Sequence, residues 1–355
     1  MKHLYQQFCL DGLPIACTPF GGGHINHTFL VVTNRARLYI LQEINSHVFK
    51  DVPGLMDNLT AVCAHLRRKD NDPRHSLSVV PTLDGRSFIT GEDGRFWRML
   101  DYVLDGICLD APESADDLYQ SGVAFGMFQN QLADFPAETL HETIPHFHDT
   151  PDRYRQLREA ICADRAGRLH EVGPEIDALL SREDEAGFLT ALCQSGELPL
   201  RVTHNDTKLN NVMLDAATKT PLCVMDLDTV MPGLVAHDFG DAIRFGASTA
   251  AEDETDLDKV SLSIERYQAF TSGFLTTCGK RLTAREIETL PWGARLMTLE
   301  NAVRFMTDYL NGDMYFHISR PTHNLDRCRT QLRLVKDMEQ KWDEMNAIVQ
   351  EILAE

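Results

Sequence analysis

One stretch of the sequence, residues 202–230, combines the residue types that phosphate chemistry requires. Asp206 stands on a short polar loop, Asn211 follows it by five positions, and Asp226 comes after a second apolar run. Phosphoryl transfer needs an acceptor hydroxyl held in line and metal ions held on the phosphates. Carboxylate and amide oxygens are hard ligands that suit Mg²⁺. The spacing therefore predicts that Asp206 is a catalytic base and that Asn211 and Asp226 are metal ligands.

Two neighbouring residues extend this set. Lys208, two positions after the predicted base, is expected to reach the transferred phosphoryl group and offset its developing charge. Asp228 is expected to share a strand face with Asp226 and to hold a second ion or a substrate hydroxyl. Taken singly, each residue could be an ordinary turn or strand-capping residue. The whole set at this spacing favours catalysis.

The residues between Asn211 and Asp226 predict how these two side chains meet. Two short apolar runs, 212–214 and 222–225, flank a polar turn at 215–220. Such a pattern is typical of a β-hairpin. The second strand is expected to return the chain so that Asp226 lies beside Asn211.

The N-terminal part of the chain predicts an antiparallel sheet with one inserted helix. A helix is expected from Pro53, because apolar residues recur there at helical spacing. Strand-like runs bounded by Gly, Asn and Asp occupy residues 15–20, 28–32, 38–42, 77–83, 86–90 and 96–103.

Beyond about residue 105 the pattern becomes mostly helical. Residues 115–134 and 324–353 each carry apolar residues on one helical face, and the second segment is expected to be one long amphipathic helix. Its apolar face would pack within the chain or form a dimer seam. The sequence thus predicts an α+β fold of two lobes: an N-terminal sheet lobe, residues 1–104, and a mostly helical C-terminal lobe, residues 105–355.

Composition narrows the function classes. A chain of 355 residues is long enough for two lobes. The net charge of -19 argues against nucleic acid and anionic membranes as partners. The nine cysteines are scattered singly, and no signal peptide or membrane span is evident. We therefore expect a cytoplasmic protein with reduced thiols that acts as a monomer or weak homodimer on small molecules.

Several segments resemble a known family. The string HNDTKLNN followed by VMDLD is similar to the aminoglycoside phosphotransferase and choline kinase superfamily. The segments GGGHINHTFLV, YILQEINSHVFKD, DFGDAIRFG and LENAVRFMTDYLNGDMYFHISR look like those of the N-acetylhexosamine 1-kinases. The resemblance implies a protein-kinase-like fold, ATP and Mg²⁺ as cofactors, and phosphorylation of the anomeric hydroxyl of a hexosamine.

The resemblance also implies a nucleotide site in the N-terminal lobe. The glycine run Gly21, Gly22 and Gly23 would cover the phosphates with backbone N–H groups, although a simple hairpin turn has the same composition. Asp101 and Val103 would belong to a hinge that offers backbone groups to adenine, in a place where an ordinary strand would look alike.

Gln42 occupies the strand position where kinases carry a phosphate-binding lysine, and the following helix offers Asp57 as its only acid. Gln42 is expected to donate a hydrogen bond to phosphate without supplying charge. This departure leaves open a non-catalytic nucleotide-binding regulator.

The acceptor site rests on the family likeness more than on local pattern. His24 and Asn26 resemble the sugar-contacting stretch of the hexosamine kinases, and Arg304 and Tyr315 lie in a segment, expected to be irregular, that mixes fork-shaped donors with rings. A kinase of homoserine, choline or an aminoglycoside is the alternative within enzymes.

The string Asp238-Phe239-Gly240 matches the metal-binding motif of protein kinases. It lies too far beyond Asn211 to be joined to it by one short hairpin. We expect Asp238, Asp241 and Arg244 to form a structural cluster, with a substrate role as the alternative.

Overall fold

The computed structural model describes residues 2–21 and 26–354. The chain divides into two compact units. Unit 1 comprises Met1–Cys108, Gln131–Pro145 and Asn211–Pro232, and unit 2 comprises Leu109–Asn130, His146–Asn210 and Gly233–Glu355. An antiparallel sheet dominates the N-terminal region and helices dominate the C-terminal region, which confirms the predicted α+β class. Unit 1 also takes up two segments that lie beyond the sequence boundary at residue 104.

Unit 1 is built around a five-stranded antiparallel sheet of order β1-β2-β3-β5-β4, with a second sheet of order β6-β8-β9. Its elements are α1 (Lys2–Tyr5), β1 (Pro14–Pro19), β2 (His27–Thr33), β3 (Leu38–Ile44), α2 (Val52–Lys69), β4 (Ile89–Thr90), β5 (Phe96–Asp101), β6 (Gly106–Ile107), the 3-10 helix η1 (Ala137–Thr139), β8 (Val212–Asp215), β9 (Pro221–Val224) and the 3-10 helix η5 (Leu227–Thr229).

The two faces of the five-stranded sheet differ in chemistry. Leu41 pairs with Met99 across β3 and β5, and both side chains are fully buried in an apolar cluster on one face. The next pair, Gln42 with Arg98, points to the opposite face because side chains alternate along a strand. A sheet with one apolar face and one partly polar face results.

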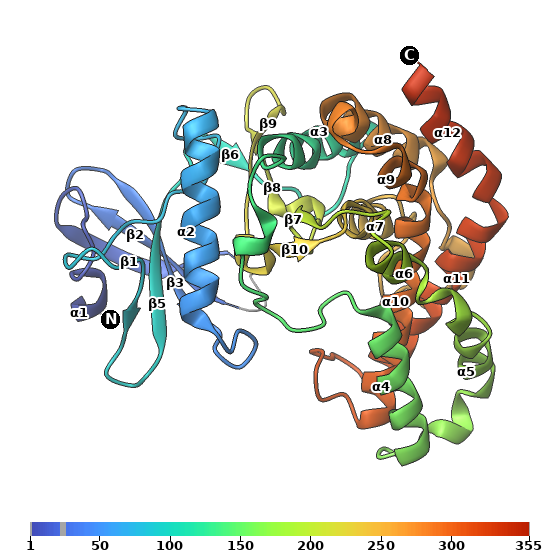
Figure 1. The fold of residues 1–355 in the computed structure, drawn as a ribbon. Coiled ribbons are helices and arrows are strands. Elements are labelled where there is room, and N and C mark those ends of the chain that lie inside the picture. Colours follow the sequence, from blue (N-terminus) through green and yellow to red (C-terminus); the bar gives the residue numbers. More distant parts are fainter. Residues whose placement is uncertain (1, 22–25, 355) are drawn as a thin grey trace. The chain divides into compact units, whose positions relative to one another are not determined.

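Helix α2 begins at Val52, one residue before the predicted start at Pro53, and it runs beside the sheet (Figure 1). The Asp51 carboxylate accepts a hydrogen bond from the Gly54 N–H and caps the N-terminus. Three basic residues, Arg67, Arg68 and Lys69, occupy the last turn, where positive charge is favourable.

The predicted strand at 77–83 was wrong. That segment makes only isolated bridges, between Val79 and Leu100 and between Phe8 and Thr82. A turn at Asp84-Gly85 follows this segment, since the Thr82 N–H donates to the Arg86 carbonyl. Only β4, two residues long, continues into the sheet from this turn.

Unit 2 is largely helical. Its elements are α3 (Ala115–Gln131), α4 (Thr150–Ala163), η2 (Leu169–Glu171), α5 (Gly173–Leu180), η3 (Glu183–Glu185), α6 (Phe188–Gln194), β7 (Arg201–Thr203), η4 (Leu209–Asn211), β10 (Met231–Gly233), α7 (Val235–Gly246), η6 (Leu257–Lys259), α8 (Ile264–Cys278), η7 (Gly279–Arg281), α9 (Ala284–Glu288), α10 (Leu290–Asn311), α11 (His323–Gln340) and α12 (Trp342–Ala354). The short elements η4 and β10 each extend into residues that belong to unit 1. Among the described residues, no helix combines the length and apolar character needed to cross a membrane.

Helix α10 is the centre of unit 2 and packs against α4, α7 and α11. Its crossing with α7 depends on two glycines. A Cβ added at Gly240 would lie 2.1 Å from the Gly293 carbonyl oxygen, and one added at Gly293 would lie 1.9 Å from the Ala236 carbonyl oxygen. The close approach holds α7 against α10, and α7 carries the acidic residues Asp238 and Asp241.

The C-terminal segment is two helices, so the prediction of one continuous helix was wrong. Helix α11 ends at Gln340 and α12 begins at Trp342. Lys341 between them donates from Nζ to the Leu262 carbonyl and to Asp337, at 2.8 Å each. The apolar residues on both helices, including Val335 and Met345, are buried within the chain. Packing inside unit 2 thus accounts for the apolar periodicity.

Candidate active site

In unit 2, the loop of residues 204–208, called here the Asp206 loop, follows strand β7 directly. Its first residue, His204, is fully buried and packs edge-on against Phe125 and Phe128, with ring centroids 5.6 and 5.9 Å away. The next residue, Asn205, has φ +64° and is buried. His204 is therefore a packing residue that fixes the start of the loop.

The Asp206 loop is held mainly through its backbone by two acids of helix α7. Asp238 accepts hydrogen bonds from the N–H groups of His204 (2.8 Å) and Asn205 (2.7 Å). Asp241 accepts from the Thr207 N–H at 3.0 Å and is paired with Arg244. The contacts confirm that Asp238, Asp241 and Arg244 are a structural cluster. Asp238, the first residue of the Asp238-Phe239-Gly240 string, thus holds the backbone of the Asp206 loop.

Asp238 is fully inside the protein, and burial raises the pKa of its carboxyl group even though the two N–H donors favour the charged form. A third donor, the Gln129 side-chain amide, reaches the same carboxylate at 2.9 Å. Gln129 was not identified from the sequence, since nothing in the local pattern of its helix marks it.

Asp206 and Lys208 lie together, as their spacing suggests. The Lys208 Nζ is 2.8 Å from Asp206 Oδ1, and the Asp206 N–H donates to His204 Nδ1 at 3.2 Å. Burial opposes the charged amine, but the carboxylates of Asp206 and Asp241 outweigh it and raise the pKa of Lys208. The Asp206 carboxylate therefore lies beside an amine that stays positively charged. The roles of base and phosphate contact stay predictions.

Two buried histidines, His148 and His237, lie side by side, and His148 contacts the Asp206 loop. His148 Nε2 lies 3.1 Å from the Asn205 carbonyl oxygen, and its Nδ1 lies 3.0 Å from Glu300. Burial opposes protonation, yet Glu300 raises the pKa of His148. Burial likewise opposes ionisation of Glu300, but His148 and the Thr150 hydroxyl lower its pKa to about 2. The neighbouring His237, 5.3 Å away by ring centroid, has its pKa lowered to about 3 by burial and by His148.

No pattern in the sequence indicated the pair of His148 and Glu300. The two residues are 152 positions apart, and His148 stands in a charged segment with several Gly and Pro. Their joint contact with the Asp206 loop exists only in the folded chain.

In unit 1, strands β8 and β9 form the hairpin predicted between Asn211 and Asp226, called here the Asp226 hairpin. Val212 pairs with Val224, and the Met225 N–H donates to the Asn211 carbonyl at 2.8 Å. Asp226 follows this last bond directly. The hairpin prediction is confirmed, and it brings Asn211 next to the backbone of Asp226.

The expectation that Asp226 and Asp228 share one strand face was wrong. Strand β9 ends at Val224, and Asp226 adopts a left-handed conformation with φ 53° and ψ 57°. Residues Leu227–Thr229 then form the 3-10 helix η5. Neither Asp226 nor Asp228 therefore lies on a strand.

The donors at the Asp226 hairpin fit a magnesium ion that is shared with a phosphate ligand. Asn211 and Asp226 supply an amide oxygen and a carboxylate, which are hard oxygen donors. Among the described residues, no group of three or more His, Cys, Asp or Glu could form an all-protein metal cage. Mg²⁺ is typically bound by one or two carboxylates and otherwise by water and phosphate oxygens.

Asp228 is engaged by other side chains in unit 1. Both of its oxygens are bonded to the guanidinium of Arg98, with Nη2 at 3.0 Å from Oδ2, and both side chains are buried. The Asn26 amide donates to Oδ2 at 2.7 Å. Metal binding by Asp228 and substrate binding by Asn26 stay predictions. Arg98 was missed, although a single arginine in an otherwise apolar strand was a usable signal.

Those predicted nucleotide-binding residues that the structure describes all lie in unit 1. Gly21 has φ +72°, a conformation that suits glycine. Gly22, Gly23 and His24 lie outside the described residues.

The other predicted nucleotide residues have contacts of their own. The Gln42 side chain donates to the Thr28 hydroxyl at 3.2 Å and accepts from Arg98 Nε at 2.9 Å. The Asp101 N–H donates to the Ser78 carbonyl, so Asp101 would have to contact adenine through its own carbonyl. Val103 is buried. Their roles in nucleotide binding stay predictions.

In unit 2, Arg304 lies in a cluster of aromatic rings. Its guanidinium carbon is 5.8 Å from the ring centroid of Phe147, 5.9 Å from Tyr315 and 5.3 Å from Phe316. Arg304 belongs to helix α10, which corrects the expectation of an irregular segment there. Tyr315 is in the irregular stretch that follows and is 64% exposed.

The turn that carries Tyr315 is fixed by one buried carboxylate. Asp308 accepts hydrogen bonds from the N–H groups of Met314, Tyr315 and Phe316, at 2.8 to 2.9 Å. Asn324 donates to the same carboxylate at 2.9 Å. The ring cluster around Arg304 is therefore preorganised by the protein.

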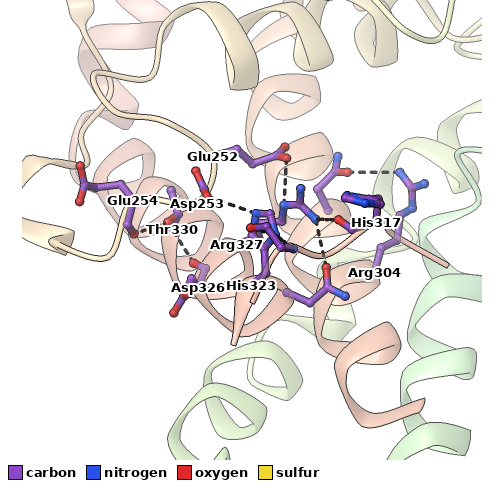
Figure 2. A network of polar contacts seen from close by, with 12 residues as sticks. Glu252, Asp253, Glu254, Arg304, His317, His323, Asp326, Arg327 and Thr330 are labelled. Atoms are coloured by element: carbon purple, nitrogen blue, oxygen red, sulfur yellow. Dashed lines mark hydrogen bonds and ion pairs between the residues drawn. The ribbon is translucent and has the colours of Figure 1, made fainter. Parts of the chain in front are cut away.

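Figure 2 shows the polar network that lies beside this cluster. Arg327 donates to the His317 carbonyl at 3.2 Å, and His323 Nε2 lies 3.2 Å from Asp253. The Thr330 hydroxyl donates to the Glu254 carbonyl at 3.0 Å. Acidic residues of the loop before η6 thus meet the basic residues of α11, so the charges of this region are largely paired within the protein.

Comparison with known proteins agrees with this architecture. Residues 16–267 match the model of the phosphotransferase enzyme family. The fold is similar to that of a microcompartment-associated aminopropanol kinase (TM-score 0.60, 16% identity, 97% of each chain). It is also similar to an aminoglycoside phosphotransferase from Alicyclobacillus acidocaldarius (TM-score 0.61, 11% identity, 100% of this chain and 97% of that one).

A third similar structure is the amicoumacin kinase hAmiN in complex with AMP-PNP, Ca²⁺ and Ami (TM-score 0.59, 13% identity, 93% of this chain and 91% of that one). At these identities the structures establish the shared fold. Since the family model covers well over half of the 355 residues, this chain belongs to the phosphotransferase enzyme family.

Proposed function

We propose that this phosphotransferase moves the γ-phosphoryl group of ATP to the anomeric hydroxyl of a hexosamine and so makes a sugar 1-phosphate. The observation that carries the chemistry is the Asp206 loop. Its backbone is bonded to Asp238, Asp241 and His148, and its carboxylate lies 2.8 Å from Lys208. A preorganised acid of this kind is suited to position a hydroxyl and accept its proton.

In the proposed reaction, the oxygen of the acceptor hydroxyl forms a bond to the γ-phosphorus. The bond between that phosphorus and the β–γ bridging oxygen breaks, and ADP leaves with the bridging oxygen. The hydroxyl proton passes to the Asp206 carboxylate. Lys208 offsets the negative charge that develops on the transferred group.

Asn211 and Asp226 are the residues that would hold Mg²⁺ in this proposal. When bound, the metal supplies positive charge to the phosphate oxygens. The amicoumacin kinase structure, which contains AMP-PNP and Ca²⁺, supports a triphosphate nucleotide and a divalent cation for this chain as well.

The Arg304 cluster supports a hydroxyl-rich acceptor without positive charge. Arg304 and Arg153 both border Phe147, because the Arg153 guanidinium donates to the Phe147 carbonyl at 2.8 Å. Burial and the charge of Arg304 lower the pKa of Arg153. Sugars are commonly held by planar donors and rings, whereas a cationic acceptor would be repelled by two arginines.

The cluster is near the Asp206 loop within unit 2. Arg304 is one helical turn after Glu300 on α10, so both face the same side. Glu300 binds His148, and His148 contacts the Asn205 carbonyl, next to Asp206. We propose that Arg304 and Tyr315 contact the sugar while Asp206 contacts its anomeric hydroxyl.

The competing acceptor class is a cationic amino alcohol, as in the similar aminopropanol kinase. A coupled assay of ADP release should compare N-acetylglucosamine, N-acetylgalactosamine, glucose and galactose with aminopropanol, choline, homoserine and kanamycin. We expect turnover on an N-acetylhexosamine and loss of its reducing end in the product. Faster turnover on any amine would refute the sugar assignment. ATP binding without turnover on any acceptor would favour a nucleotide-binding regulator.

A further inference from the structure

We propose that the buried ion pair between Arg98 and Asp228 is a positioning device for the Asp226 hairpin, and that Asp228 acts through Arg98 and not as a metal ligand. The inference rests on the proposed nucleotide chemistry and assigns a role to Arg98, which takes no part in that chemistry as described above. The whole arrangement lies in unit 1.

Arg98 is the end of a polar ladder across the sheet. Thr28, Gln42 and Arg98 are successive register partners on β2, β3 and β5. Their side chains are joined in a row, because Gln42 donates to Thr28 and Arg98 Nε donates to Gln42. The remaining nitrogens, Nη1 and Nη2, bind the two oxygens of Asp228. The guanidinium fork thus connects the central strands to the turn after β9.

An ion pair this deeply buried needs a reason other than stability. Both side chains are 2–3% exposed, and removing two charges from water costs more than most pairs regain by attraction. A bidentate arginine does supply direction, because its planar donors fit a carboxylate in one geometry. The free-energy cost of burying this ion pair is explained if the pair serves to fix the position of Asp228.

The turn that carries Asp226 is held on both sides of that residue. Before it, the Met225 N–H is bonded to Asn211. After it, Asp228 is bonded to Arg98 through its side chain and to the Thr143 hydroxyl through its carbonyl, at 3.1 Å.

Asp226 itself has φ 53°, which lies in the left-handed region that is uncommon for a residue with a Cβ. Such residues persist where the surroundings over-determine them. Of the two contacts that hold Asp228, the bond from Arg98 to the side chain is charged and the bond from Thr143 to the carbonyl is neutral, so we expect the Arg98 bond to be the stronger.

Both oxygens of Asp228 are engaged by side-chain donors, and the positive charge of Arg98 beside them opposes a metal cation at the same carboxylate. Oδ1 is bonded to Arg98, and Oδ2 is bonded to both Arg98 and Asn26. Asn26 in turn accepts from the Asn45 N–H at 3.0 Å. The Asp228 carboxylate therefore connects Asn26 and strand β5 to η5.

The test compares R98M and D228N by Mg²⁺ titration of ATP-analogue binding, measured by calorimetry with AMP-PNP and no acceptor. Loss of a residue that orients a metal ligand typically weakens metal affinity 10- to 100-fold. We expect that loss in both single variants, and no further loss in R98M/D228N, because each change removes the same device. R95M is the matched control, since the Arg95 side chain is 55% exposed and pairs with Asp93 and Glu43 and not with Asp228; its Mg²⁺ affinity should be unchanged.

Other outcomes overturn the proposal. If Asp228 is a metal ligand, D228N loses Mg²⁺ affinity while R98M keeps it. If Arg98 instead binds phosphate, R98M weakens AMP-PNP binding in EDTA and D228N does not. R98M alone leaves a buried uncompensated carboxylate and could unfold, so circular dichroism and Tm are recorded for R98K and for R98M/D228N, which avoids that charge. Failure on every sugar acceptor would refute the proposed function without affecting these binding results.

Discussion

The Asp206 loop and the Asp226 hairpin are held in place by opposite means. The loop is bonded mostly through backbone groups, which donate to the buried acids Asp238 and Asp241 of one helix. The hairpin is held by its own backbone ladder and by one charged side-chain pair, Asp228 with Arg98. In the proposed mechanism the Asp206 side chain is thereby left for chemistry, and in the proposed positioning role Asp228 helps to orient Asp226.

This difference predicts how each region fails. Changing a reactive side chain should remove activity without loosening the structure. Changing a support should loosen the structure, by more in the loop, where one carboxylate satisfies several buried donors, than in the hairpin, where the strand ladder remains.

The largest expected effect is on the reactive side chain of the loop. D206N removes the proton acceptor but keeps the shape, so kcat should fall about 10²- to 10⁴-fold, the usual contribution of a general base. Single-turnover kinetics and AMP-PNP binding measure the two halves of this prediction. Binding should stay within about twofold. A variant with full kcat would show that Asp206 is not the base.

The next effect separates support from chemistry. D238A leaves two buried N–H groups of the loop, those of His204 and Asn205, without their acceptor. An unsatisfied buried donor costs about 1–3 kcal/mol, so urea unfolding should show a loss of roughly 2–5 kcal/mol. E159A, at an exposed acid that pairs with Arg155 on the surface, is the control and should be near neutral. Equal stability of D238A and E159A would contradict the supporting role.

A third test uses pH. The depressed pKa of Glu300, from its usual 4.5 to about 2, contributes up to about 3 kcal/mol of stability above pH 4.5 and loses it as the pH falls toward 2. The raised pKa of His148 contributes below its usual 6.5 and loses it as the pH rises through the raised value.

The stability difference between wild type and E300Q should therefore be greatest between about pH 4.5 and 6.5. Urea unfolding from pH 3 to 9 measures it. A difference that does not change with pH would show that Glu300 and His148 are not an ion pair.

The smallest expected effect is in the hairpin. T143A removes the hydroxyl that donates to the Asp228 carbonyl at 3.1 Å, a loss of about 1 kcal/mol in unfolding free energy. T139A, which removes an exposed hydroxyl bonded to the Pro136 carbonyl, is the matched control with a smaller loss. If T143A were as destabilising as D238A, the two regions would not differ in the way proposed here.

The sequence predicted best where contacts are local. The hairpin between Asn211 and Asp226 formed as expected, because Val212 and Val224 are close in the chain and their pairing follows from alternating apolar residues and a polar turn. Helix α2 began as expected because Asp51 caps it within three residues. Periodicity failed at Lys341, where a contact with the distant Leu262 carbonyl coincides with the helix break.

What the sequence determined by itself was the family and the α+β class, and it also predicted Asp206, Asn211 and Asp226 as the residues for the proposed chemistry. Tertiary structure alone decided what holds them. Arg98 meets Asp228 across 130 positions, and Glu300 meets His148 across 152. Such partners are chosen by strand register and helix packing, which bring together side chains whose local sequence carries no record of the contact.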